Sequence, residues 1–194
     1  MPRIYVVWPW MLLASMFAVL AAPEAGLAQS AVEGNASLRI DDLRVGFDGV
    51  YKVGVWTPVA VDLRGGAAAA RGKLVLTTPD VDDVMTDVVS REEITVPPGQ
   101  TVTVNMFVRF GAVRSQLQAR FVPSEEGAAG VTRQWSAAQS GANQLPVAVG
   151  TDREIVVVLG PEIDFAAVAA LHRMPDGTSQ MVPAQIASAK ELPE

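Results

Sequence analysis

Few side chains in this chain could do chemistry. There is no cysteine and one histidine, His172. The missing cysteines exclude disulfides, thiolate metal ligands and cysteine nucleophiles, and a single histidine excludes histidine-rich metal sites and histidine dyads. His172 is followed by Arg173, and no nucleophile-elbow pattern surrounds Ser179 or Ser188. We therefore expect a surface histidine rather than a general base, and no catalytic residues.

Four aspartates follow one of the expected strands: Asp80, Asp82, Asp83 and Asp87. Carboxylate oxygens suit Ca²⁺, but the spacing lacks the glycine and the terminal glutamate of an EF-hand loop. Solvated turn residues that guard an edge strand are the preferred interpretation. We expect neither a bound metal nor a cofactor.

Three aromatic residues are candidates for ligand contact: Tyr51, Trp56 and Trp135. Trp56 with Tyr51 could form an aromatic platform for a sugar ring, and Trp135 adds to the motivation for a carbohydrate-binding sandwich. Aromatic residues in sandwich strands more often fill the core between the two sheets. The core interpretation is preferred, and the platform is kept as the candidate site.

The first 28 residues are typical of a secretory signal. Arg3 precedes an apolar run from Ile4 to Ala22, and small residues close the segment at Gly26-Leu27-Ala28. The alternative is a retained anchor, because this run is just long enough to span a bilayer. Pro9 and the small residues favour cleavage after Ala28. Both alternatives export the chain, so we expect it in the periplasm or at the cell surface.

Composition limits the partners. Removing 28 residues from 194 leaves 166, enough for one domain and part of a second. Arg3 and Glu24 cancel within the leader, so the mature chain keeps the net charge of −6. An acidic surface matches phosphate backbones poorly, so we expect no nucleic acid.

From Ala36 to Phe121, short runs of alternating apolar and polar residues are separated by Gly, Pro and Asp. The apolar members of the clearest run are Val102, Val104, Met106, Val108 and Phe110. A slip at Asp41-Asp42 predicts a bulge. Pro58 predicts a sheet edge or a strand switch, because proline cannot donate to a ladder. The pattern predicts a mainly β fold, an immunoglobulin-like antiparallel β-sandwich.

The last part of the chain follows a different pattern. Glu154 to Gly160 contains a continuous apolar run, typical of a strand buried on both faces. A helix from Phe165 to His172, capped by Asp164, and a strand from Gln180 to Ile186 would complete β-α-β. The chain then ends at Glu194, so we expect an incomplete unit.

These patterns divide the chain into five parts. They are a signal peptide (1–28), a tether (29–35), a β-sandwich domain (36–122), a flexible connection or hairpin (123–152) and the start of a truncated α/β domain (153–194).

The stretch GFDGVYKVGVWTPV at 46–59 resembles part of a class of large membrane-anchored bacterial surface proteins of unassigned function. Three further segments fit the same resemblance: the turn at Pro97-Pro98-Gly99-Gln100, the run 154–160 and the closing Glu191-Leu192-Pro193. It implies a signal peptide, an immunoglobulin-like sandwich and then a glutamine-amidotransferase-like α/β domain, usually followed by a transmembrane helix. The α/β domain has barely begun at Glu194, so no catalytic residue carries over.

We therefore expect a non-catalytic, extracytoplasmic module that serves as a scaffold or interaction domain at the cell envelope. The alternatives are a carbohydrate-binding sandwich and the front end of a larger protein with an amidotransferase-like domain. Expected partners are other envelope proteins or a surface glycan. Membrane contact is expected only through an uncleaved leader or a missing C-terminal anchor.

Overall fold

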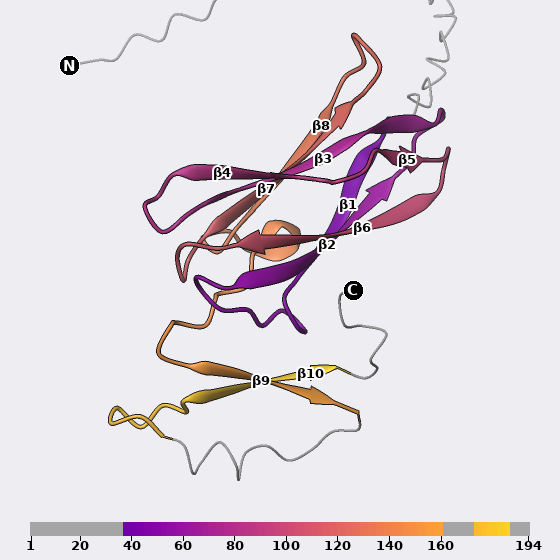
Figure 1. The fold of residues 1–194 in the computed structure, drawn as a ribbon. Coiled ribbons are helices and arrows are strands. Elements are labelled where there is room, and N and C mark those ends of the chain that lie inside the picture. The colour runs from indigo at the N-terminus through magenta and orange to yellow at the C-terminus, as the bar shows by residue number, and fades with distance from the viewer. Residues whose placement is uncertain (1–36, 161–172, 187–194) are drawn as a thin grey trace, which may run out of the picture. The chain divides into compact units, whose positions relative to one another are not determined.

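The structure is a computed structural model and describes residues 37–160 and 173–186 (Figure 1). The expected signal peptide (1–28), the tether (29–35) and the helix from Phe165 to His172 lie outside the described residues. Within the described ranges, no helix is long and apolar enough to cross a membrane.

The first sheet has three antiparallel strands in the order β1-β2-β6. Their bounds are Arg39–Val45 for β1, Trp56–Arg64 for β2 and Thr101–Arg109 for β6. The register of β1 against β2 shifts between Ile40 and Asp42, which confirms the predicted bulge.

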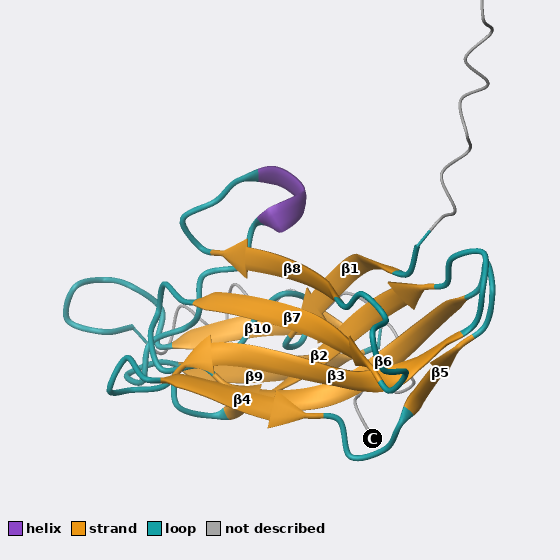
Figure 2. Cartoon of the chain, turned by 90° about the horizontal axis from the view of Figure 1, so that it is seen from above, coloured by secondary structure: helices purple, strands orange, loops and turns teal. Residues whose placement is uncertain are grey.

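The second sheet has the order β4-β3-β7-β8, and β5 also pairs with β3. Their bounds are β3 Ala70–Pro79, β4 Met85–Val89, β5 Ile94–Val96, β7 Gln116–Pro123 and β8 Val131–Ser136. All of these pairings are antiparallel. Seen from above, β4 and β8 lie at opposite edges of this sheet (Figure 2).

The core lies between the two sheets, and its residues come from both. Val59, Val61 and Leu63 of β2 are at most 1% exposed, and Leu74, Leu76 and Leu117 of the second sheet are fully buried. Burying these side chains from water is the main stabilising contribution. The predicted fold class is therefore confirmed: the described chain is mainly β and forms an antiparallel sandwich.

The clearest predicted strand is β6. Its apolar residues alternate inward as expected: Met106 is 8% exposed, Val108 is fully buried, and Val102 and Val104 are half-buried. The intervening residues, from Thr101 to Arg109, are exposed.

The sandwich does not end at residue 122. Residues 131–136 form β8, which makes a hairpin with β7, and Trp135 of this strand is 2% exposed. Leu145 and Ala148 also join the core. The expected end of the sandwich is therefore too early, because β8 fills part of the core that the other strands leave open.

Arg133 on β8 links the second sheet to β1 of the first sheet by hydrogen bonds. Its guanidinium donates hydrogen bonds to the carbonyl oxygens of Ile40 (3.0 Å) and Asp41, and to that of Ala142 (3.0 Å). Ala142 belongs to the short 3₁₀ helix η1, Gly141–Asn143. Arg133 thus ties the β1 bulge to β8.

β9 (Glu154–Leu159) and β10 (Met181–Ile186) form a separate parallel pair. This pair supplies the two strands of the expected incomplete β-α-β unit. The prediction that this strand is buried on both faces is wrong, because Val157 is 37% and Leu159 51% exposed. Parallel sheets bury both faces only when helices cover each side.

Candidate binding surface

Tyr51, the first predicted ligand-contact aromatic, is a core residue. It is 1% exposed, and its ring centroid lies 4.6 Å from that of Phe110. Its hydroxyl donates a 2.8 Å hydrogen bond to the carbonyl oxygen of Pro146. Burial raises the pKa of this phenol, so the group stays a neutral donor. Tyr51 cannot contact a ligand at the surface.

Trp135, the second candidate, is also buried. The guanidinium carbon of Arg133 lies 4.9 Å from its ring centroid, a cation–π distance. The same arginine is fixed by the β1 carbonyls, so Trp135 is packed beneath it. The alternative of an aromatic platform is therefore wrong, and the preferred core interpretation is confirmed for Tyr51 and Trp135 but not for Trp56.

Trp56, the third candidate, is 62% exposed at the first position of β2. The alternation of β2 explains this, because Thr57 and Val59 point inward and Trp56 therefore points outward. A tryptophan side chain gains much free energy on burial, so one held in water on a regular strand marks a candidate binding residue.

Trp56 lines a groove of about 270 Å³ between the end of β6 and the β3–β4 hairpin, called here the Trp56 groove. Its other side chains are mainly those of Thr78, Asp80, Val81, Thr86, Val88, Val108 and Arg109. The volume is near the lower end for small-ligand sites. The groove fits a single side chain or a single sugar ring.

Gly111 allows the loop after β6 to approach the β3–β4 turn closely at the Trp56 groove. A Cβ on Gly111 would lie 2.0 Å from the backbone carbon and oxygen of Asp80. The amide of Gly111 donates to the carbonyl oxygen of Pro79 at 3.1 Å. The loop after β6 can therefore lie directly against the β3–β4 turn.

The acidic cluster builds that turn. The Asp80 carboxylate accepts hydrogen bonds from the amides of Asp82 and Val84, both at 2.9 Å. Asp87 accepts a 2.6 Å bond from the Thr77 hydroxyl. Within the described ranges, no three metal-ligating side chains come together. These carboxylates fix a turn that holds Val81 64% exposed beside the Trp56 groove.

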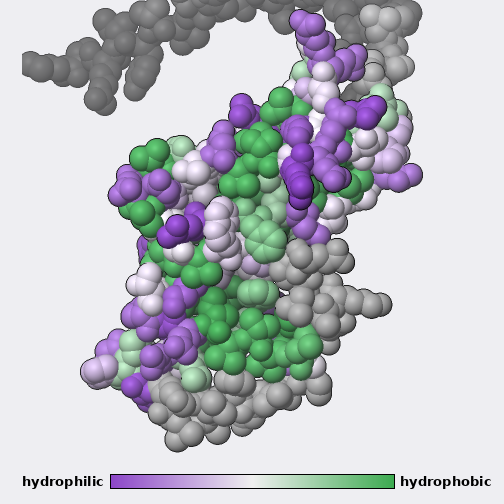
Figure 3. Space-filling view, in the orientation of Figure 1, coloured by the Kyte–Doolittle hydropathy of each residue, from purple (hydrophilic) through white to green (hydrophobic). Residues whose placement is uncertain are grey.

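Further exposed apolar side chains occur close in sequence to residues of the Trp56 groove. Val55, Val84, Met85 and Phe107 are 50%, 59%, 50% and 41% exposed. Hydrophobic surface is visible at the turn end of the β3–β4 hairpin (Figure 3). Phe107 and Trp56 occupy diagonal positions on one face of the β2–β6 ladder. Trp56 and Phe107 thus place two exposed aromatic side chains on the outer face of the sheet.

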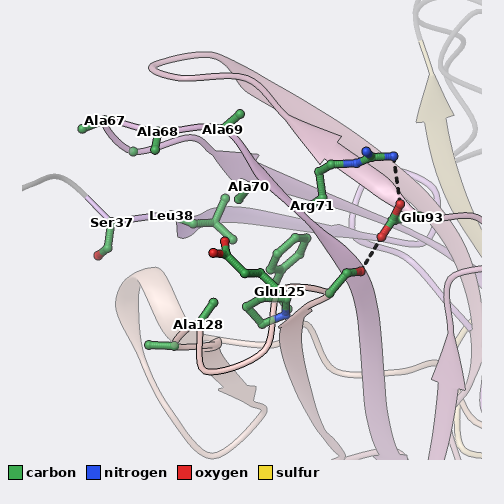
Figure 4. A pocket seen from close by; sticks show the side chains of 15 residues that line it. Ser37, Leu38, Ala67, Ala68, Ala69, Ala70, Arg71, Glu93, Glu125 and Ala128 are labelled. Carbon is green, nitrogen blue, oxygen red and sulfur yellow. Dashed lines mark hydrogen bonds and ion pairs between the residues drawn. The ribbon is translucent and has the colours of Figure 1, made fainter.

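A larger basin of about 810 Å³ lies at another place in the sandwich, lined largely by alanines 67–70 and 128–129 (Figure 4). Two of its charged side chains, Arg71 and Glu93, form an ion pair. Arg71 donates a 3.0 Å bond to Glu93, and the Ser124 hydroxyl donates to the other oxygen of the same carboxylate. The Ser124 hydroxyl and the Arg71 charge lower the pKa of Glu93.

This Ser124–Glu93 pair does not make a nucleophile. A carboxylate with a lowered pKa is a weak base, and activation of a serine needs a base that is itself oriented by a third group. His172 lies outside the described residues. The Ser124–Glu93 pair therefore gives no reason to place a reaction in the basin. The Trp56 groove is the better candidate binding site, because an exposed aromatic side chain lines it.

Comparison with known families shows where the sandwich belongs. Residues 40–138 match a family described as Domain of unknown function (DUF8726), which is 99 of the 194 residues. The chain belongs to the DUF8726 family. The matched range runs from β1 to just beyond β8, so the DUF8726 domain includes the last strand of the second sheet.

Among solved structures, the chain is similar to Spo0M, a sporulation control protein from Bacillus subtilis, at 15% identity and a TM-score of 0.35. The match covers 53% of this chain and 48% of that protein, so it spans about half of each. Nothing about function follows at this level of similarity. None of the curated proteins compared with the chain matches it.

Proposed function

We propose that this DUF8726 chain is a non-catalytic interaction module of the cell envelope that binds its partner at the Trp56 groove. The observation that carries the proposal is the 62% exposure of Trp56 beside an apolar cavity. Aromatic anchors of this kind contribute much of the binding free energy at protein interfaces. The partner is another envelope protein that inserts an apolar side chain into the groove.

The polar edge of the groove supports a second candidate, a carbohydrate ligand. Arg109 and Thr86 line the same cavity as Trp56. An exposed indole ring can stack on a sugar while these groups bind its hydroxyls. Tyr51 and Trp135 are buried and add nothing to this site, so a sugar would have one aromatic contact.

The extracytoplasmic part of the proposal rests on the leader pattern at 1–28. The parallel β9–β10 pair supports a further proposal, that the chain is the front end of a larger surface protein with an amidotransferase-like domain. N-terminal sequencing of the exported protein is expected to begin at Gln29. A chain found only in the cytoplasm with Met1 or Pro2 at its start would contradict the export proposal.

Binding is tested by sedimenting the exported chain with isolated cell-envelope fragments. We expect co-sedimentation of the parent and of Val122→Ala, which removes an exposed side chain from β7, 39% exposed. Trp56→Ala is expected to weaken binding by at least about tenfold. Equal sedimentation of parent and Trp56→Ala would overturn the proposal.

The same assay separates the two candidate ligands. Loss of binding after protease treatment of the envelopes supports a protein partner. Loss after digestion of the envelope glycans, with binding kept after protease treatment, supports the carbohydrate alternative instead.

A further inference from the structure

A second surface, the outer edge of β6, is unlike the other sheet edges. In the described part of the chain, β6 pairs only with β2 and ends its sheet. Its backbone groups on the far side therefore have no ladder partner. Such an edge is a template for another strand.

The hydrogen bonds at both ends of β6 show which residues face this edge. The carbonyl oxygens of Gln100 and Phe110 accept bonds from the amides of Gly65 (2.8 Å) and Gly54 (2.9 Å), which lie at the ends of β2. Backbone groups alternate in direction along an antiparallel strand. The residues that turn their N–H and C=O to the free edge are therefore Thr101, Thr103, Asn105, Phe107 and Arg109.

The other edges of the sandwich are protected. β4 has five residues and carries Asp87, β5 has three residues, and β1 contains the bulge beside Asp41 and Asp42. β8 has six residues and is tied to β1 by Arg133. Short strands, charges and bulges are the usual ways of blocking edge pairing.

β6 has none of these protections. It is nine residues long, without proline or a bulge, and its one charged residue is Arg109 at the end. A segment of high β propensity and low charge pairs readily when it is exposed. The half-buried state of Val102 and Val104 shows that the core is also incompletely covered beside this edge.

We propose that the free edge of β6 pairs antiparallel with the same edge of a second copy of this chain, with Asn105 opposite Asn105. This register pairs all nine residues of the strand. It would form about ten backbone hydrogen bonds and join the two three-stranded sheets into one.

The side chains of β6 suit a second copy. In this register Arg109 lies opposite Thr101 and not opposite its own copy, so no like charges face each other. Val102 lies opposite Val108, which continues the apolar inner face across the junction. The nearest carboxylate on the outer face, Asp62, is already bound by Arg44 at 2.8 Å. A two-fold pairing also covers both free edges at once.

The chain has no cysteine, so a single introduced thiol reports on the register. Opposed residues of a hydrogen-bonded pair lie about 5.5 Å apart between their Cα atoms, within the reach of a disulfide. Asn105→Cys is therefore expected to give a covalent dimer as the main product under mild oxidation with diamide. Thr101→Cys, on the same edge, is expected to give little, because the two copies of Thr101 lie at opposite ends of the junction.

The parent is expected to sediment as a dimer, and Asn105→Pro as a folded monomer. The amide of Asn105 points away from β2, so proline there removes no bond of the β2–β6 ladder. A monomeric parent, a dimeric Asn105→Pro or equal cross-linking at Thr101→Cys and Asn105→Cys would overturn the proposal. If Asn105→Pro fails to fold, the two cysteine variants still decide it. The pairing reaches Arg109, whose side chain lines the Trp56 groove, but the substituted residues Thr101 and Asn105 do not line it, so these variants test the pairing separately from the proposed function.

Discussion

Trp56 and Arg109 lie directly opposite each other across the β2–β6 ladder, and both line the Trp56 groove. The Nε of Arg109 donates a 2.9 Å hydrogen bond to the carbonyl oxygen of Gly54, which fixes the arginine at the end of the strand. The sheet thus presents an exposed aromatic ring beside a positioned cation. This pair is the most specific feature of the proposed binding surface.

The two tryptophans of the sandwich are expected to differ sharply in their contribution to stability. Trp135→Ala removes a side chain that is 2% exposed and should lower the free energy of unfolding by about 3–5 kcal/mol. Trp56→Ala removes one that is 62% exposed and should change it by no more than about 0.5 kcal/mol. Urea titration of both variants measures the difference. Equal changes in the free energy of unfolding for the two variants would show that β8 does not contribute to the core.

The close approach at the groove predicts a large effect for a single methyl group. Gly111→Ala should destabilise the fold by about 1–3 kcal/mol, because its Cβ would lie 2.0 Å from the backbone of Asp80. Gly150→Ala is the matched control, since its nearest neighbour is the movable side chain oxygen of Asp152 at 2.5 Å. Thermal unfolding compares the two. A Gly111→Ala variant as stable as Gly150→Ala would show that the loop can move away.

The Tyr51 hydroxyl joins two segments far apart in the chain. Tyr51→Phe deletes the 2.8 Å bond to Pro146 and should cost about 1–3 kcal/mol, because the partner carbonyl loses its donor. Chemical denaturation gives the value. No change in the free energy of unfolding would mean that water replaces the hydroxyl.

The hydrogen bonds of Asp62 predict part of the loss of folding stability at low pH. Its pKa lies below the ordinary range because Arg44 donates two hydrogen bonds to it, at 2.8 and 3.1 Å, and Thr103 donates a third at 2.6 Å. A carboxyl with a lowered folded pKa stabilises the fold above its unfolded pKa of about 4, and this stability is lost as the pH falls through the folded value.

Asp62→Asn should therefore remove roughly 0.5–1 kcal/mol near pH 7 and flatten the decline of stability on acidification. The measurement is the free energy of unfolding between about pH 6 and pH 2. Parallel curves for the parent and the variant would show that Asp62 titrates normally.

Local patterns predicted much of this fold. The alternation of β6 and the slip at Asp41-Asp42 depend on neighbours in the chain, and both appear as expected. Pro58 predicts a sheet edge or a strand switch, but it lies in β2, the central strand of its sheet. Its carbonyl accepts the Gly46 amide at 2.8 Å, so its nitrogen also faces the β1 side, where β1 has ended at Val45.

The candidate site was only partly readable from the sequence. Side chains of a strand alternate between its two faces, and Val59, Val61 and Leu63 point inward. Trp56 lies an odd number of residues from each of them, so the alternation alone predicts that Trp56 points outward. The burial of Tyr51 depends on Pro146, 95 residues away, and that of Trp135 on the carbonyls of β1. Such contacts are set by the fold and leave no local signal.

The Trp56 groove is tested most directly by photo-cross-linking in living cells. A photoreactive residue is placed at Val81, which is 64% exposed in the groove, or at Val122 on the second sheet as control. We expect an adduct with one envelope component from position 81, its loss in the Trp56→Ala background, and none from position 122. No adduct from position 81, or an adduct that persists without Trp56, would contradict partner binding at the Trp56 groove.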